Sequence, residues 1–183
     1  WNYCKIDGDF QLAIDLLPDM IANYMEWEKS HLNPSGLFWS IDDRDAMEIS
    51  ISGSGLRPTL NAYMYADAVA IANIARLAED FELERRFKEK ANRLKQLVQK
   101  HLWDDQAQFF KVIPLKNAED TVEQWEFQKM DPDHNVREQL GYIPWAFHLP
   151  DDGYEQAWTQ LMDPAGFYAH SVQQLRSSAM PDS

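Results

Sequence analysis

Residues 58–79 (PTLNAYMYADAVAIANIARLAE) constrain the fold more than any other stretch of this chain. Apolar residues recur there at helical spacing, and they cover the opposite face as well as one stripe. A helix that is apolar nearly all round is buried on several sides, and its many alanines allow neighbouring helices to come close. The sequence therefore predicts an inner helix that needs other helices around it.

Residues 82–103 predict a second helix of a different kind. One stripe is apolar and charged residues cover the rest, which indicates an outer helix with a solvated face. The short link between the two helices predicts an antiparallel αα-hairpin over residues 58–103. One inner helix with one outer helix is the building unit of an α/α toroid. We therefore expect an all-α fold, built from αα-hairpins as part of an (α/α)6 toroid.

The segments before and after this hairpin give weaker predictions. Asp9 suits the cap of a helix that runs to about residue 30, bent or restarted at Pro18. Residues 101–112 should end the outer helix and continue as a turn with a short extended piece. Residues 114–135 lack clear periodicity and predict a long excursion, with a helical turn near 121–129.

The C-terminal part predicts shorter elements. Residues 136–149 should form a loop that leads to a short helix, residues 152–163 a helix with an Asp cap, and residues 170–183 a frayed tail. We interpret residues 1–183 as a single partial domain. An inner helix buried on all sides needs more neighbours than this chain supplies, and the chain begins with Trp rather than Met.

Charge and composition exclude several classes of function. The net charge of −13 argues against nucleic acid, which needs a basic footprint, and against anionic membrane surfaces. No run of 18 apolar residues predicts a membrane span. The chain has one cysteine and no signal-peptide pattern at its start, which leaves the location open but favours the cytoplasm.

The acidic loop, residues 36–57, is the candidate for chemistry. It carries Asp42, Asp43, Asp45 and Glu48, with Arg44 among them. Hydrolysis of a glycosidic bond needs one carboxylic acid to protonate the leaving oxygen and one carboxylate to activate water or attack. Because like charges disfavour ionisation, a crowded carboxyl group can stay protonated and act as the acid. The loop therefore favours cleavage of a carbohydrate substrate.

Side chains around these acids suit the binding of a sugar. Arg44 and Arg57 could keep a neighbouring carboxylate charged or bond sugar hydroxyls, and Asn61 could donate to a hydroxyl. Trp39 offers a flat aromatic face of the kind that packs on sugar rings.

Other readings of the same residues stay open. The acidic loop also fits a solvated turn, or a calcium site, although its spacing does not match an EF-hand. The five histidines have no metal-ligand spacing, so we predict neither a metal nor a cofactor. The apolar inner helix also fits a non-catalytic interaction module. A sugar epimerase or lyase would need His or Tyr proton carriers, for which the histidines are not placed.

Several blocks of the chain resemble a known family. These are DGDFQLAIDLLPDMIANYMEWEKSHLNPSGLFW, DRDAMEISISGSGLRPTLNAYMYADAVAIANIARLAED, KANRLKQLVQKHLWDDQAQFF and VREQLGYIPWAFHLPDDGYEQAWTQLMDPAGFYA. They resemble the (α/α)6 six-hairpin glycoside hydrolases, and within these the mannosylglycerate-hydrolase-like group, which is related to trehalases and processing α-glucosidases. The resemblance extends to about residue 169 and implies an inverting glycosidase, of which this chain covers middle hairpins.

The resemblance implies a general acid in the acidic loop. In related glycosidases the acid is an aspartate in a glutamate-serine-glycine-x-aspartate loop ahead of a leucine-asparagine inner helix, which Leu60 and Asn61 match. If residues 46–48 replace glycine-x-aspartate, with alanine for glycine, the acid is Glu48. If Arg44-Asp45 is the match, the acid is Asp45. The link to the leucine-asparagine pair is shorter here than in the family.

The rest of the implied site lies further along the chain. Arg137 and Glu138 would lie on a later loop that faces the site. The catalytic base of such enzymes comes from a later segment rich in tryptophan and glycine, which this chain lacks. The missing remainder of the toroid, or a self-associating copy of the chain, is therefore the expected protein partner.

Overall fold

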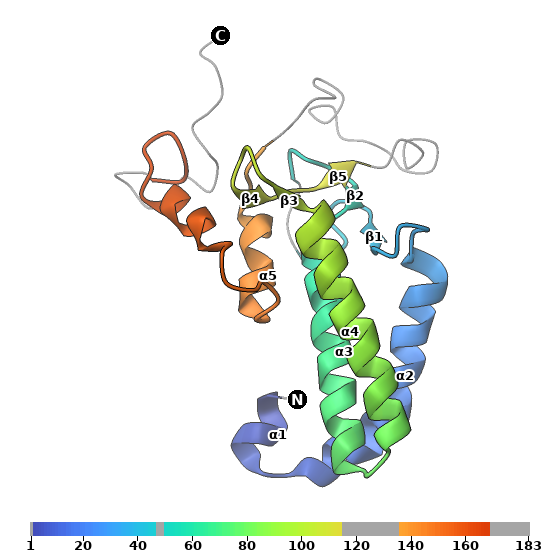
Figure 1. Cartoon of the computed structure of the whole chain (residues 1–183). Helices are drawn as coiled ribbons and strands as arrows, with labels where there is room; N and C mark the ends of the chain where they lie inside the picture. Colours follow the sequence, from blue (N-terminus) through green and yellow to red (C-terminus); the bar gives the residue numbers. More distant parts are fainter. Residues whose placement is uncertain (1, 47–49, 115–135, 169–183) are drawn as a thin grey trace.

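A computed structural model of the chain describes residues 2–46, 50–114 and 136–168 (Figure 1). Its α-helices are α1 (Asn2–Asp7), α2 (Phe10–His31), α3 (Pro58–Leu77), α4 (Phe81–His101) and α5 (Ile143–Ala146), and its 3₁₀ helices are η3 (Gln139–Tyr142) and η4 (Glu155–Leu161). The strands are β1 (Trp39–Ser40), β2 (Gly55–Leu56), β3 (Trp103–Asp104), β4 (Phe109–Phe110) and β5 (Ile113–Pro114). The predicted all-α class is confirmed.

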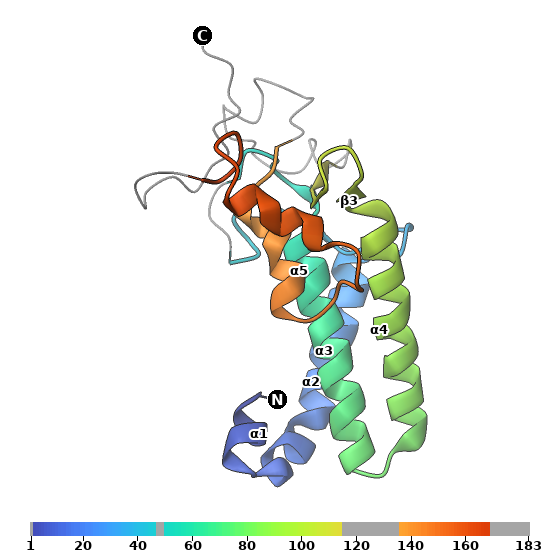
Figure 2. The same cartoon turned by 60° about the vertical axis from the view of Figure 1, so that its left-hand side comes forward.

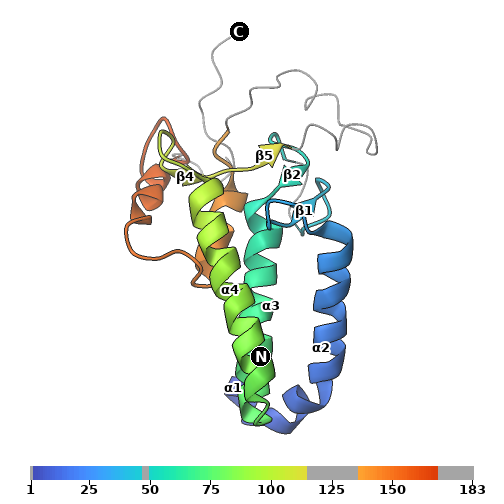
Figure 3. The ribbon, with the colours of Figure 1, turned by 45° about the vertical axis from the view of Figure 1, so that its right-hand side comes forward.

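The centre of the fold is the hairpin of α3 and α4, with α2 packed against α3 (Figures 1 and 3). No side chain of α3 from Pro58 to Ala75 is exposed, as expected for an inner helix. In α4, by contrast, the buried residues form one stripe and most of the charged ones are exposed. The hairpin therefore has the inner and outer helices that the sequence predicts.

The helix α2 begins where the sequence predicts and continues through its proline. The Asp9 carboxylate accepts hydrogen bonds from the backbone N–H groups of Gln11 and Leu12, at 3.1 and 3.3 Å. This cap satisfies two of the N–H groups that the first turn of a helix leaves without a partner. Pro18 lies inside a single helix that ends at His31.

The end of α2, the start of α3 and the end of α4 lie at one end of the helices, where the short strands also gather (Figures 1 and 2). The strand β2 lies between β1 and β5 in an antiparallel sheet, and β3 pairs with β4. A side chain at Gly55 in β2 would lie 2.3 Å from the carbonyl oxygen of Ile113, so only glycine allows this pairing. The two ends of the acidic loop therefore pair with each other as β1 and β2, and β5 adds a third strand.

The C-terminal elements differ in part from the prediction. Residues 136–149 contain η3 and the short helix α5, as expected, but residues 152–163 contain the 3₁₀ helix η4 in place of an α-helix. The Thr159 hydroxyl donates to the carbonyl of Gln156 at 2.7 Å, a local bond of the kind that competes with α-helical pairing. The predicted turn near 121–129 and the predicted tail at 170–183 lie outside the described residues.

Within the described part of the chain, no helix has the length and apolar character needed to cross a membrane.

Candidate active site

Arg57 occupies the cap position of α3 and is completely buried. Its Nε donates to Oδ2 of Asp45 at 2.6 Å, and its Nη2 donates to Oδ1 of the same carboxylate at 3.2 Å. The third nitrogen, Nη1, donates to Oδ1 of Asp42 at 3.1 Å. Arg57 thus makes a two-point ion pair with Asp45 and a second ion pair with Asp42.

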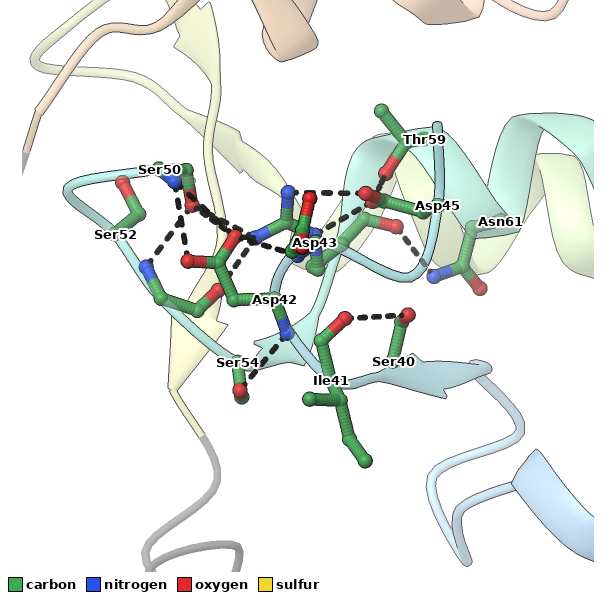
Figure 4. Close-up of polar contacts among 12 residues, drawn as sticks. Ser40, Ile41, Asp42, Asp43, Asp45, Ser50, Ser52, Ser54, Thr59 and Asn61 are labelled. Atoms are coloured by element: carbon green, nitrogen blue, oxygen red, sulfur yellow. Dashed lines mark hydrogen bonds and ion pairs between the residues drawn. The ribbon is translucent and has the colours of Figure 1, made fainter. Parts of the chain in front are cut away.

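The same guanidinium also binds the far side of the acidic loop. Its Nη1 lies 2.8 Å from the Ser50 hydroxyl and 2.6 Å from the Gly53 carbonyl oxygen. The Ser50 hydroxyl and backbone N–H in turn donate to the Asp42 carboxylate, and Figure 4 shows these groups converging. Residues 45 and 50, on either side of the stretch that carries Glu48, therefore both bind Arg57.

Buried charges of this kind are stable only when they are paired. Asp45 also accepts a hydrogen bond from the Thr59 hydroxyl, so the partners that the structure gives its carboxylate are all donors. Asp45 is therefore held in place as a hydrogen-bond acceptor, by Arg57 at both oxygens and by Thr59 at one of them. The geometry of Asp45 suits an ion pair better than a proton donor.

Tyr63 lies one turn after Thr59 on α3 and makes a further contact with Asp45. Its hydroxyl donates to the backbone carbonyl of Asp45 at 3.1 Å. Burial raises the pKa of the Tyr63 hydroxyl, the Asp45 carboxylate raises it further, and Arg57 partly offsets this. The phenol therefore stays neutral and remains a donor. We call Asp42, Asp45, Ser50, Arg57 and Thr59 the Arg57 cluster.

Asn61 holds the start of the acidic loop. Its buried side-chain amide donates to the carbonyls of Phe38 and Arg57, both at 2.8 Å, and its oxygen accepts from the Phe38 N–H at 2.8 Å. Asn61 thus uses its donors on the protein backbone, and the geometry favours a structural role over the predicted contact with a sugar hydroxyl.

Trp39 and Arg44 are more accessible than the Arg57 cluster. Trp39 is half-buried and stacks on His31, with 5.0 Å between ring centroids and 28° between planes. His31 also contacts Trp27, at 4.5 Å between centroids, and burial lowers the pKa of the imidazole, so His31 is neutral at pH 7. Arg44 is exposed. Both side chains can reach a ligand from the surface of the acidic loop.

Arg137 and Glu138 are neighbours in the chain just before η3, and Glu138 is the cap residue of that helix. Glu138 accepts hydrogen bonds from the backbone N–H groups of Ile51 and Ser52, at 2.8 and 3.0 Å. The Nε of Arg137 donates to the carbonyl of Ala107 at 2.9 Å. Glu138 therefore contacts the acidic loop directly, and Arg137 binds the turn between β3 and β4.

The stretch that carries Glu48 lies outside the described residues, since these stop at residue 46 and resume at residue 50. Ala46, the last residue before the gap, has a positive φ of 61°. This left-handed conformation favours glycine, the residue that the family motif has at the position matched by Ala46 when Glu48 is the acid.

The sequence alone does not predict the contacts of Ser50, Thr59 and Tyr63. One signal was available for Thr59, because Arg57, Thr59 and Asn61 alternate along the chain just before and inside the first turn of α3. No comparable signal marks Ser50 or Tyr63. Their partners are set by how the acidic loop folds over the end of the helix.

A metal site is not formed by the acids that the structure describes. Among residues 2–46, 50–114 and 136–168, no group of three or more His, Cys, Asp or Glu side chains is arranged to hold a metal ion. Asp42 and Asp45 are two of the acids that a calcium site in the acidic loop would use as ligands. Both bind Arg57 instead.

The inner–outer pair of α3 and α4, with the acidic loop at one end, fits a fragment of an α/α toroid. The model of the "Mannosylglycerate hydrolase MGH1-like glycoside hydrolase domain" family matches residues 1–179. The chain therefore belongs to this family, as its sequence blocks indicated.

A solved structure supports the same conclusion. A protein named "Sialidase" aligns with a TM-score of 0.76 and 37% sequence identity, over 89% of this chain and 14% of that protein. The chain thus spans a small part of that protein's length. No curated protein matched the sequence.

Proposed function

We propose that the protein hydrolyses an O-glycosidic bond with inversion at the anomeric carbon, and that Glu48 is its general acid. The observation that carries the assignment is the ion pair between Asp45 and Arg57, which occupies both oxygens of the Asp45 carboxylate. Of the two predicted acids, Glu48 is then the one left for proton transfer. The left-handed backbone at Ala46 supports the same register of the family motif.

In this proposal the Arg57 cluster is the support of the acid. Asp45 and Ser50 are joined through one guanidinium, which fixes the two ends of the stretch between them. A catalytic group must stay close to its reactive position, because a displacement of about 1 Å can lower the rate about 100-fold. Asp45, Arg57 and Asn61 act as positioning residues.

The accessible side chains are the proposed substrate contacts. Trp39 offers an aromatic face whose orientation is set by the stack on His31. Arg44 offers a cation and five N–H donors that can bond sugar hydroxyls or a negatively charged substituent.

Inversion also needs a second carboxylate to activate a water molecule, at about 6.5–9.5 Å from the acid. We propose that this base comes from outside these residues, either from the remainder of the toroid or from a second copy. Leu12 and Leu16, one turn apart on α2, are 42% and 46% exposed and offer apolar surface to such a neighbour.

The test compares the variants Glu48→Gln and Asp45→Asn. Both are made in the full-length product of the gene. We expect Glu48→Gln to abolish hydrolysis of aryl glycosides and of glycosylglycerates while leaving the unfolding temperature unchanged. Asp45→Asn should lower the unfolding temperature as well as the rate. Proton NMR of the first-formed product reports its anomer.

Other outcomes would contradict parts of the proposal. Full activity in Glu48→Gln removes Glu48 from the acid role, and loss of activity without loss of stability in Asp45→Asn transfers that role to Asp45. A product that keeps the anomer of the substrate excludes inversion.

A further inference from the structure

The carboxylate of Glu138 is bound to two residues of the acidic loop that lie 87 and 86 positions earlier in the chain. It accepts from the N–H groups of two successive residues, Ile51 at 2.8 Å and Ser52 at 3.0 Å, and also from the Ser52 hydroxyl. Three donors on one carboxylate leave it little capacity to bind a sugar hydroxyl. The contact instead fixes the path of the backbone at residues 51 and 52.

This piece of backbone lies between two ligands of Arg57. Ser50 precedes it and Gly53 follows it, and both accept from Nη1 of the guanidinium. The turn of residues 50–53 is therefore fixed by Arg57 through its ends and by Glu138 through its middle. Because Ser50 is the first described residue after Glu48, the turn sets where the stretch that carries Glu48 must end.

Glu138 is itself attached to a rigid part of the molecule. It precedes η3, whose Gly141 packs so closely that a side chain there would lie 2.2 Å from the Phe109 ring and 2.4 Å from the Phe110 carbonyl oxygen. Its neighbour Arg137 donates to the Ala107 carbonyl. The carboxylate thus belongs to a segment that packs on the β3–β4 hairpin, and not to the acidic loop itself.

We propose that Glu138 is a positioning residue of the active site, which fixes the Ser50 end of the stretch that carries Glu48. The role depends on the proposed function, in which Glu48 donates the proton. Asp45, paired with Arg57, fixes one end of the stretch, and Glu138 fixes the other through two backbone N–H groups. Removal of the Glu138 carboxylate leaves the acid present but badly placed.

The test uses Glu138→Ala and Glu138→Gln in the complete protein. Glu155→Gln is the matched control, because the Glu155 carboxylate also accepts a backbone N–H, that of Gly153 at 2.7 Å, but lies in η4. In Glu138→Ala we expect kcat to fall about 100-fold with KM changed less than about 3-fold, which is the signature of a misplaced catalytic group. Glu138→Gln keeps one acceptor oxygen, so its kcat should lie between those of Glu138→Ala and wild type.

A second measurement does not need activity. Amide hydrogen exchange at Ile51 and Ser52 should speed up by about 10-fold or more in Glu138→Ala, while exchange in the middle of α3 stays as in wild type. If the wild-type protein hydrolyses no glycoside, the proposed function fails, and the exchange data still decide whether Glu138 orders the loop.

Two results would overturn the inference. Unchanged exchange at Ile51 and Ser52 shows that Glu138 does not hold the turn. A raised KM with unchanged kcat makes Glu138 a substrate contact instead. If Glu138→Ala does not fold, Ser52→Ala replaces it, because this variant removes one of the three donors. We expect a smaller fall in kcat and a smaller increase in amide exchange at residues 51 and 52.

Discussion

Arg57 donates to both oxygens of Asp45, from Nε at 2.6 Å and from Nη2 at 3.2 Å, and solvent reaches neither side chain. A buried guanidinium and carboxylate that match at two points hold each other's position and orientation. The pair joins Asp45 to the cap residue of the inner helix α3, twelve positions later in the chain. The loop therefore takes its geometry from the most buried helix of the fold.

Replacing Arg57 by lysine should destabilise the protein strongly. The ammonium group cannot bind Asp45 at two points and reach Asp42 and Ser50 as well, so buried carboxylates lose partners. We expect a loss of about 3–5 kcal/mol in the free energy of unfolding, measured by urea titration. Arg85→Lys is the control, since the ion pairs of Arg85 lie on the exposed face of α4, and it should leave the urea midpoint unchanged. Equal midpoints for the two variants would contradict this role of Arg57.

Replacing Ala46 by glycine should stabilise the protein. Ala46 has a φ of 61°, where a side chain clashes with the backbone and glycine does not. After allowing for the greater freedom of glycine in the unfolded chain, we expect a gain of about 0.5–1 kcal/mol in the free energy of unfolding. Ala66→Gly, the same change inside α3, should cost about 1 kcal/mol. A loss of stability in Ala46→Gly would contradict the left-handed conformation.

Replacing Gly141 by alanine should disturb η3 and, through it, the Glu138 contact. The new methyl group would lie 2.2 Å from the Phe109 ring, and both this ring and the Phe110 carbonyl would have to move. Forced repacking of this kind costs about 1–3 kcal/mol in the free energy of unfolding. We also expect faster amide exchange at Ile51 and Ser52. Wild-type exchange at these two residues would show that η3 moves independently of the acidic loop.

Asp67 gives a prediction on pH. It lies half-buried on α3, no partner for its carboxylate is found among the described residues, and burial raises its pKa. Folding then favours the protonated form, so Asp67 supports stability below the usual aspartate pKa and loses this effect as the pH rises through the raised value. Asp67→Asn should therefore unfold at a higher temperature than wild type at neutral pH.

The difference in unfolding temperature between Asp67→Asn and wild type should shrink as the pH of the buffer is lowered from about 7 to about 4. Asp67 becomes protonated over this range and loses its charge. Thermal unfolding followed by circular dichroism measures it, with Asp19→Asn on the exposed face of α2 as the control. A difference that stays constant with pH would show that the charge of Asp67 is not its cause.

The helices of this protein could be predicted because their signals are local. The apolar periodicity of residues 58–79 predicted α3 to within two residues at its C-terminal end, and the Asp9 cap predicted the start of α2. Residues 152–163 were expected to form an ordinary helix, but a local hydrogen bond of Thr159 and the i→i+3 pairing of η4 replace it.

The candidate site was predicted less completely, since its contacts join distant residues. The acidic residues and Arg57 stood out in the sequence, and the family resemblance pointed to Glu138, yet the partners of these residues could not be predicted. That Arg57 would bind Asp45 and Ser50, or Glu138 the backbone at Ile51, depends on how the chain crosses the end of α3. Residue types indicated the chemistry, and only the fold shows which partner each side chain contacts.

The alternation of Arg57, Thr59 and Asn61 has a use beyond this chain. These residues bind the acidic loop at Asp45 and Ser50, at Asp45 again, and at Phe38. A protein sequence with R-x-T-x-N at the start of an alanine-rich helix, and with aspartates twelve and fifteen positions before the arginine, satisfies the same set of bonds. Such a pattern can be sought in uncharacterised sequences, where it would mark a closed acidic loop even when the acid itself has changed.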